Sequence, residues 1–296
     1  MVSKGTENGL AVLKTRIEKP MQFPVVAAGH YHVYDGSHDG LSCTVTSYAT
    51  GKEKHARRLQ NNFFAAATYY ASLFGMPYPF DHQDVIEVNS WGFGQAPPGV
   101  IFITQEAFSP LQDTLTRIFS GGVNERFVHE IAHAYWGHVI KMPNLEEQWL
   151  TESFAEYSAA MCIEAMNSNR KKGRKAFAKI LNSWKGGVKT MGEGGSIFLA
   201  NHFSGEQDTD AMDRIHLLYH KGPLVLHAIR LDLRKRFGKE KGDKAFIILL
   251  RAFLKNFPYQ YGATHHLIGI LNQLTKSDWQ PWFDRYVFGT EVPPLG

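Results

Sequence analysis

Two spacings of apolar side chains occur along the chain, one typical of strands and one typical of helices. Alternating and β-branched residues at 23–29 and 41–48 predict a β-hairpin, whose loop is the Gly- and Asp-rich stretch 34–40. From His55 to Phe74 the apolar residues recur at helical spacing, and Gly75 follows as a stop signal. The sequence therefore predicts a short β piece followed by a long helix.

The rest of the chain divides into a mixed part and a helical part. Short apolar runs predict strands at 84–88 and 100–104. Beyond residue 166 helical spacing dominates, and helices are predicted at 224–234, 243–257 and 264–288. Polar, glycine-containing stretches predict loops that could border a cleft at 186–195 and 204–210. We therefore expect an α+β fold with a mixed β-sheet and a mostly helical C-terminal half.

The strongest chemical signal is the segment 128–134, Val-His-Glu-Ile-Ala-His-Ala. His129 and His133 are four residues apart, so on a helix they project from one face and can meet one ion. Glu130 points a little aside, where it could take a proton from a metal-bound water instead of binding the metal. A catalytic zinc site has three protein ligands and one open position, so a third ligand must come from elsewhere.

Glu152 is the candidate for that third ligand. Eighteen residues separate it from His133, which is room for the first helix to end, turn at 141–144 and return as an antiparallel second helix. Glu146 and Glu147 would favour the positive N-terminal end of that second helix. With fourteen histidines in the chain the pentapeptide could arise by chance in an ordinary core helix, but the second segment makes that explanation weak.

These two segments resemble the M1 metallopeptidases, the family that includes the aminopeptidases N and leukotriene A4 hydrolase. Its members have the same pentapeptide, then eighteen residues, then a glutamate inside Trp-Leu-Asn-Glu-Gly-Phe-Ala. This chain has Trp-Leu-Thr-Glu-Ser-Phe-Ala at 149–155. The resemblance covers most of the chain. It implies a thermolysin-like zinc peptidase domain at 51–296, preceded by an N-terminal arm and β-hairpin remnant at 1–50, with one Zn²⁺ per chain.

Further residues around this site follow from the same resemblance and, for Glu156, from helical spacing. Tyr219 begins a Tyr-x-Lys-Gly motif whose tyrosine reaches the oxyanion of the tetrahedral intermediate in the family, and a phenol can donate that hydrogen bond. A buried tyrosine at a helix entry is the alternative. Glu156 lies one turn after Glu152 and could orient a ligand histidine through its free ring nitrogen. Glu147 and His138 are weaker candidates for such supporting roles.

The chain departs from the family at 94–99, Gly-Gln-Ala-Pro-Pro-Gly. The family's aminopeptidases have Gly-Ala-Met-Glu-Asn there, and its glutamate binds the free amino group of the substrate. Gly94, Gln95 and Ala96 stay candidates for substrate binding, but no acid is present and the two prolines cannot donate backbone hydrogen bonds. Aminopeptidase, endopeptidase, a hydrolase of N-blocked or non-peptide substrates, and a zinc-binding scaffold with little activity all stay open.

Composition narrows the class of protein without deciding the function. A net charge of +4 is too small to argue for nucleic acid, and no nucleic-acid module is present. The resemblance to the M1 metallopeptidases implies a peptide substrate as the partner. Cys43 and Cys162 have no paired spacing, which favours buried thiols. No apolar run is long enough for a membrane helix and no signal peptide is evident, so we expect a soluble chain. The compartment stays open, and further domains of a longer natural protein could flank the chain.

Overall fold

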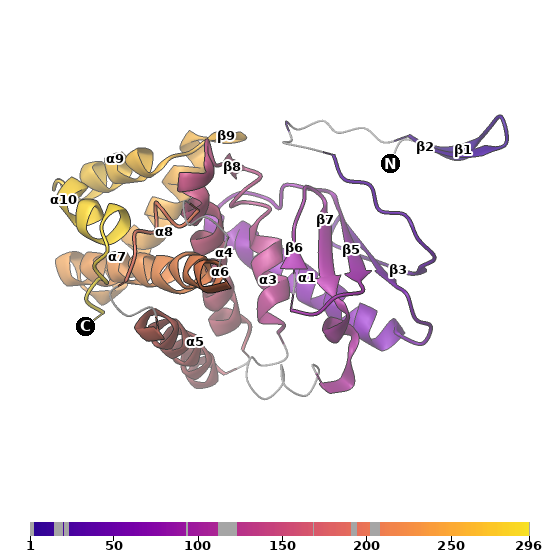
Figure 1. Ribbon diagram of the computed structural model, residues 1–296, viewed down its shortest axis with the longest axis horizontal. Coiled ribbons are helices and arrows are strands. Elements are labelled where there is room, and N and C mark those ends of the chain that lie inside the picture. Colours follow the sequence, from indigo (N-terminus) through magenta and orange to yellow (C-terminus); the bar gives the residue numbers. More distant parts are fainter. Residues whose placement is uncertain are drawn as a thin grey trace.

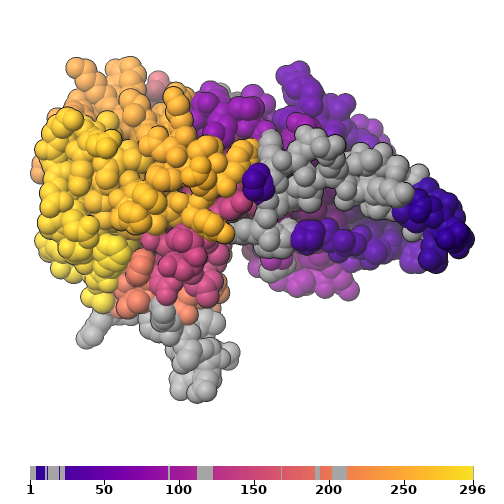
Figure 2. Space-filling model, turned by 90° about the horizontal axis from the view of Figure 1, so that it is seen from above, coloured from indigo at the N-terminus to yellow at the C-terminus, as the bar shows by residue number. Residues whose placement is uncertain are grey.

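The computed structural model describes residues 3–14, 20, 24–92, 94–111, 123–167, 169–190, 194–201 and 208–295. A sheet with a long helix forms one side of the molecule in Figure 1, and stacked helices form the other. Between them lie α3 (Glu125–Ala132) and α4 (Trp149–Met166). Figure 2 shows the same division from above, with the C-terminal residues at one end. The mixed fold with a helical C-terminal half is confirmed.

The main sheet has five strands in the order β3-β4-β5-β7-β6. Across the sheet these strands are β3 (His32–His38), β4 (Leu41–Ser47), β5 (His82–Val88), β7 (Val100–Thr104) and β6 (Gly94–Gln95). The three central strands pair in parallel, and both outer strands are antiparallel to their neighbours. The strands expected at 84–88 and 100–104 are therefore present, and the short strand β6 forms an edge of the sheet.

The N-terminal hairpin differs from the prediction. No strand forms at 24–31, and most of the stretch expected to be a loop belongs to β3. The turn is confined to Asp39 and Gly40, whose φ angles of 48° and 81° suit a two-residue hairpin. Gly36 stays in the strand because the side-chain amide of Gln60 packs on it. The same amide donates hydrogen bonds to one backbone carbonyl of β3 and one of β4.

A second hairpin near the N-terminus was not predicted at all. The polar sequence there has no clear period, yet β1 (Ser3–Glu7) pairs with β2 (Leu10–Lys14) in antiparallel register. The β3–β4 hairpin, in contrast, belongs to the main sheet because β4 pairs with β5. The sheet is thus continuous across residue 50, where the sequence suggested that the catalytic domain begins.

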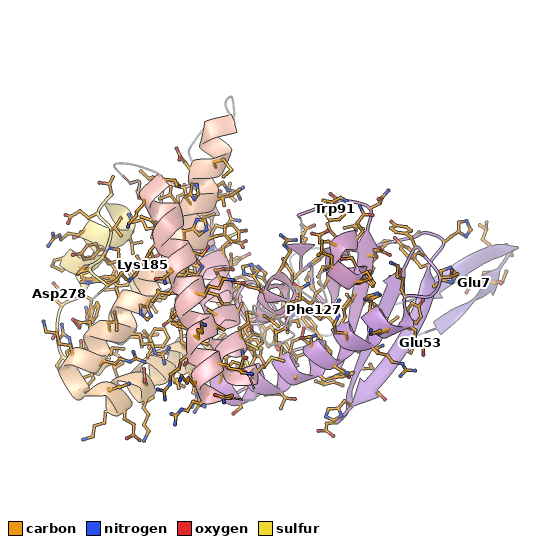
Figure 3. The ribbon with its side chains drawn as sticks, turned by 90° about the horizontal axis from the view of Figure 1, so that it is seen from below. Glu7, Glu53, Trp91, Phe127, Lys185 and Asp278 are labelled. Atoms are coloured by element: carbon orange, nitrogen blue, oxygen red, sulfur yellow. The ribbon has the colours of Figure 1, made fainter. Side chains whose placement is uncertain are left out.

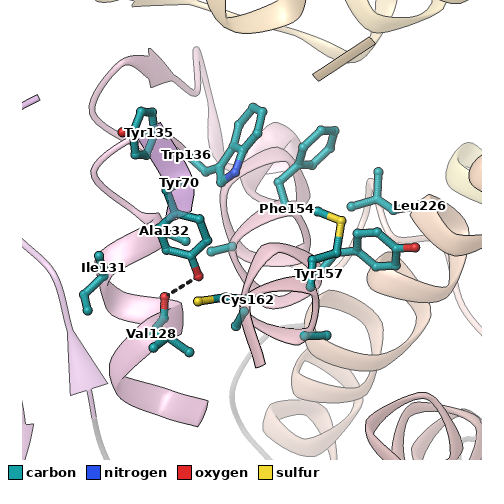
Figure 4. Close-up of a cluster of buried hydrophobic side chains, with 14 of the residues drawn as sticks. Tyr70, Val128, Ile131, Ala132, Tyr135, Trp136, Phe154, Tyr157, Cys162 and Leu226 are labelled. Atoms are coloured by element: carbon teal, nitrogen blue, oxygen red, sulfur yellow. Dashed lines mark hydrogen bonds between the residues drawn. The ribbon is translucent and has the colours of Figure 1, made fainter. Parts of the chain in front are cut away.

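The long helix α1 (Glu53–Phe74) confirms the expected helix and stops at Gly75, whose φ is 65°. Its buried face packs on the sheet and on α3, and the Tyr70 hydroxyl donates to the carbonyl of Val128 at 2.9 Å. Figure 4 shows this bond among the buried side chains of α1, α3 and α4. The core thereby fixes α3, which carries the two histidines of the motif, relative to the sheet.

Helices make up most of the C-terminal half. They are α5 (Arg170–Thr190), α6 (Asp208–Ile215), a π-helical turn (His216–Lys221), α7 (Gly222–Phe237), α8 (Lys239–Asn256), α9 (Thr264–Thr275), α10 (Gln280–Phe283) and a second π-helical turn (Asp284–Phe288). Two short strands, β8 (Ile140–Lys141) and β9 (Gln260–Tyr261), pair in parallel. Among the described residues, none of these helices combines the length and apolar character that crossing a membrane requires.

Two predictions for this half were wrong in part. The loop expected from residue 186 is helical as far as Thr190. Gly187 lets α5 pack closely against the π-helical turn that precedes α7, because a Cβ at residue 187 would lie 2.3 Å from the His220 ring. The single helix expected at 264–288 is broken after α9, where Lys276 has a φ of 54°. Residues 204–207 of the other loop, predicted at 204–210, lie outside the described residues, and its last residues, 208–210, belong to α6.

Candidate metal centre

Helix α3 presents the two histidines of the motif toward α4. Its start is fixed by Asn124, whose side chain accepts a hydrogen bond from the backbone of Phe127 at 3.1 Å. The helix ends at Ala132, earlier than the sequence suggested, and His133 still has helical backbone angles at its C-cap. The helix cannot continue past Gly137, because that residue has a φ of 130°. Figure 3 shows Phe127 of this helix between the sheet and the C-terminal helices.

Helix α4 brings Glu152 to the same place. The Asn144 side chain accepts from the backbone of Glu147 at 3.2 Å and starts a short 3-10 turn, from which α4 continues. Glu152 lies in the first turn of α4, and α4 packs against α3. One carboxylate oxygen of Glu152 is 3.5 Å from Nε2 of His129 and 3.5 Å from Nε2 of His133. The three side chains are therefore assembled as the sequence suggested.

The hydrogen bonds of the two imidazoles determine what this group can bind. Nδ1 of His129 is 2.9 Å from a Glu156 carboxylate oxygen, and Nδ1 of His133 is 2.9 Å from the carbonyl of Trp136. Both partners only accept, so both Nδ1 atoms carry hydrogen and each neutral ring keeps its lone pair on Nε2. The two Nε2 atoms are only 3.0 Å apart. Such facing lone pairs, next to a carboxylate, need a shared cation or an additional proton.

This donor set fits a metal ion. Each of the three residues offers one ligand atom, and these atoms all lie within 4.8 Å of one another. Two imidazoles and one carboxylate are a ligand set that leaves a tetrahedral zinc one open position. The carboxylate of Glu156 also accepts a hydrogen bond from Nε1 of Trp184 at 3.2 Å, so it is held from α5 while it holds the ring of His129.

Glu130 lies beside this group and against the edge strand. Its side chain is buried, and a Cβ built on Gly94 would be 2.3 Å from its Oε1 atom. Burial raises the pKa of Glu130, while the charges of His129 and His133 oppose that rise. Because Gly94 has no side chain, the edge strand leaves room for the carboxylate next to the imidazoles.

Tyr219 closes the site from the π-helical turn before α7. Its ring centroid lies 5.8 Å from that of His129. Burial, and then the negative charge of Glu152, raise the pKa of the phenol far above its usual value, so the hydroxyl keeps its hydrogen. This turn packs closely on α4. The Ser153 hydroxyl donates to the carbonyl of Leu218 at 2.7 Å, and a Cβ at residue 222 would clash with the Ser153 side chain.

The weaker candidates have different neighbours. His138 donates from Nε2 to the Ala96 carbonyl at 2.7 Å, and burial lowers its pKa to about 4, so this neutral ring ties the segment after β6 to the segment after α3. Glu147 accepts hydrogen bonds from the backbone and the hydroxyl of Thr264 and thereby holds the start of α9. Gln95 is exposed on the edge strand.

Sequence reasoning missed three residues around the centre. Trp184 on α5 and Arg214 on α6 lie far from the motif in sequence, and no local pattern marks them. Gln148 could have been noticed, because it stands four residues before Glu152 and its backbone, just before α4, is already helical, so the two side chains share a face. Its Nε2 atom donates to Oε1 of Glu152 at 3.3 Å.

A helix with two histidines four residues apart and a following helix with a glutamate define the metal-dependent hydrolase class. The model of the peptidase family M1 domain matches residues 60–286. The chain therefore belongs to peptidase family M1, as its motifs suggested.

Curated relatives and solved structures agree with this assignment. Aminopeptidase M1-C of Oryza sativa subsp. japonica is 24% identical over 211 residues, which are 70% of this chain and 22% of that protein. Tricorn protease-interacting factor F2 of Thermoplasma acidophilum is 26% identical over 188 residues, or 60% of this chain and 23% of that protein. The matched part thus spans less than a quarter of either relative.

The fold is that of solved M1 zinc metallopeptidases. The enzyme from Deinococcus radiodurans matches with a TM-score of 0.57 and 18% identity, over 90% of this chain and 53% of that one. A mutant of a two-domain M1 zinc metallopeptidase bound to L-arginine matches with a TM-score of 0.60 and 18% identity, over the same shares of both chains.

Proposed function

We propose that this chain is a zinc-dependent peptidase domain and that His129, His133 and Glu152 hold one Zn²⁺. The observation that carries the proposal is the set of three facing acceptor atoms with the Glu130 carboxylate beside it. When bound, the ion would supply Lewis acidity to the scissile carbonyl and lower the pKa of a water molecule.

The residues of the chain would move the protons. Glu130 would take a proton from the attacking water and give it to the leaving amine, which its position beside the imidazoles supports. Tyr219 would donate a hydrogen bond to the oxyanion, since its phenol stays protonated and faces His129. Glu156 would keep the ring of His129 in the tautomer that leaves Nε2 free.

Cleavage without a free amino group is a second candidate, favoured by the edge strand. Residues 94–99 contain no acid that could pair with an ammonium group. An extended substrate could still lie along β6, whose partner on the other side is β7. An N-blocked peptide or an internal segment of a longer peptide would then be accepted as well as a free N-terminus.

The test uses the zinc-loaded chain and one peptide sequence in two forms, with a free and with an acetylated N-terminus. We expect cleavage that Glu130→Gln reduces at least about 10³-fold, while the matched substitution Glu164→Gln at the far end of α4 leaves it intact. Equal rates on both peptides would support cleavage without amine recognition. If the chain binds zinc but shows no cleavage, or only cleavage that Glu130→Gln does not reduce, the peptidase proposal is overturned and a zinc-binding scaffold is favoured.

A further inference from the structure

A line of hydrogen bonds leads from the candidate metal centre to an arginine at the surface. Gln148 donates to Glu152 at 3.3 Å, and its own amide oxygen accepts from Nη2 of Arg214 at 3.0 Å. Arg214 lies in the last turn of α6, five residues before Tyr219. A guanidinium group is therefore only one side-chain amide away from a proposed metal ligand.

The position of this guanidinium is fixed by neutral groups. Nε of Arg214 donates to the Asn201 side chain at 2.6 Å, and Asn201 in turn donates to the carbonyl of Leu145 at 2.6 Å. Within the described part of the chain, no carboxylate forms an ion pair with Arg214, and its side chain is exposed. Among the side chains that the structure describes, the guanidinium therefore has only neutral hydrogen-bond partners.

We propose that Arg214 binds the C-terminal carboxylate of the substrate, so that the substrates are short peptides with a free C-terminus. This inference rests on the proposed peptidase function and names its substrate class. The planar guanidinium matches a carboxylate with two parallel hydrogen bonds, and among the described residues only Nε and Nη2 of Arg214 already donate.

The reach of a peptide supports the assignment. Glu152 and Arg214 are separated by two hydrogen bonds and one side-chain amide. One extended residue spans roughly 3.3–3.6 Å. A peptide whose scissile carbonyl lies at the metal centre would therefore place a carboxylate at Arg214 only if its chain ends one or two residues later.

The edge strand β6 is consistent with recognition of this end of the substrate. The edge strand offers no acid at residues 94–99 for an amino group, whereas Arg214 offers a cation for a carboxyl group. The chemistry therefore favours an anchor at the carboxyl end. An acidic side chain has the same chemistry as a C-terminal carboxylate, so the test must separate these two sources.

The experiment compares three versions of one tripeptide: a C-terminal acid, a C-terminal amide, and an amide whose last residue is aspartate. For the zinc-loaded wild-type chain we expect kcat/KM on the acid to exceed that on both amides by about tenfold to a hundredfold, mostly through KM. Arg214→Gln should reduce the ratio of acid to amide to about one. Arg214→Lys should restore part of it, and the control Arg285→Gln should keep the wild-type ratio.

Equilibrium binding of the same peptides to zinc-loaded Glu130→Gln separates this inference from the proposed function. The inference is supported if Glu130→Gln binds the acid more tightly than the amide and the double variant Glu130→Gln/Arg214→Gln does not, even if no peptide is cleaved. Equal affinity for acid and amide would overturn it, whatever the cleavage rates. Binding of the aspartyl amide as tight as that of the acid would also overturn it, because acidic side chains would then be the ligand. A loss of zinc from Arg214→Gln, with equal loss of activity on acid and amide, would assign Arg214 to positioning Glu152 instead.

Discussion

The contact between Gly94 and Glu130 predicts a specific loss of catalysis in Gly94→Ala. A Cβ at residue 94 would lie 2.3 Å from Oε1 of Glu130, whereas ordinary contacts begin at 3.4 Å. The carboxylate must therefore move by about 1 Å or turn away. The backbone at Gly94 is not in the left-handed region, so alanine itself is tolerated there.

The size of the effect follows from this displacement. A misplacement of about 1 Å in a catalytic group can cost roughly 10²-fold, which corresponds to about 2.7 kcal/mol of transition-state stabilisation. The free energy of unfolding should change by less than about 1 kcal/mol, because only the flexible end of a side chain has to move. Zinc affinity should stay close to that of the wild type, since the three atoms nearest to the new methyl group belong to Glu130 and Arg126, which are not proposed metal ligands.

The assay measures kcat and KM on a fluorogenic peptide together with zinc content and thermal unfolding. Gly269→Ala on α9 is the matched control, because nothing lies within 4 Å of a Cβ there. That control should keep the wild-type kcat and should not lower the unfolding temperature. A Gly94→Ala protein that binds zinc and keeps the wild-type kcat would refute the assignment of Glu130 as the proton carrier.

Three further predictions concern the ligand sphere, the oxyanion and pH. Glu156→Ala should weaken zinc binding by about 10- to 100-fold in competition with a chelating dye, because the ring of His129 loses its Nδ1 partner; unchanged affinity would speak against that role. Tyr219→Phe should lower kcat by about 10²- to 10³-fold with little change in KM or zinc affinity; an effect confined to KM would contradict oxyanion stabilisation. Burial lowers the pKa of His227 to about 4, against about 6.5 in an unfolded chain. As pH falls below about 6.5, the unfolded state therefore binds more protons than the folded state. The free energy of unfolding decreases over this range, down to about pH 4. Urea unfolding of the wild type between pH 7 and pH 5 should therefore lose about 2 kcal/mol more than that of His227→Gln, and equal losses would exclude a neutral buried His227.

The candidate metal centre could be predicted from the sequence because its geometry is local. Two histidines four residues apart need only one helical turn, and one connection brings the glutamate of the next helix to them. The same holds for α1, because the helical spacing of its apolar residues and the glycine at its end lie in one continuous segment. Where spacing and a helix stop decide the structure, the prediction and the structure agree.

Contacts between distant segments explain what the sequence could not give. Gly36 stays in a strand because the Gln60 amide from α1 packs on it, and Gly187 stays in a helix because His220 lies against it. Glu147, placed near the metal ligands by its position in sequence, bonds with Thr264, 117 residues further along the chain. The link from Arg214 to Glu152 likewise depends on how α6 meets α4.

Removal and return of the metal tests the central claim most directly. The chain would be treated with a chelator, titrated with zinc, and assayed for peptide cleavage at each addition. The account predicts no cleavage by the chelated protein, then activity that rises linearly and saturates at one zinc per chain, with no recovery in His133→Ala at the same concentrations. Full cleavage by the chelated protein, or recovery in His133→Ala equal to that of the wild type, would contradict it.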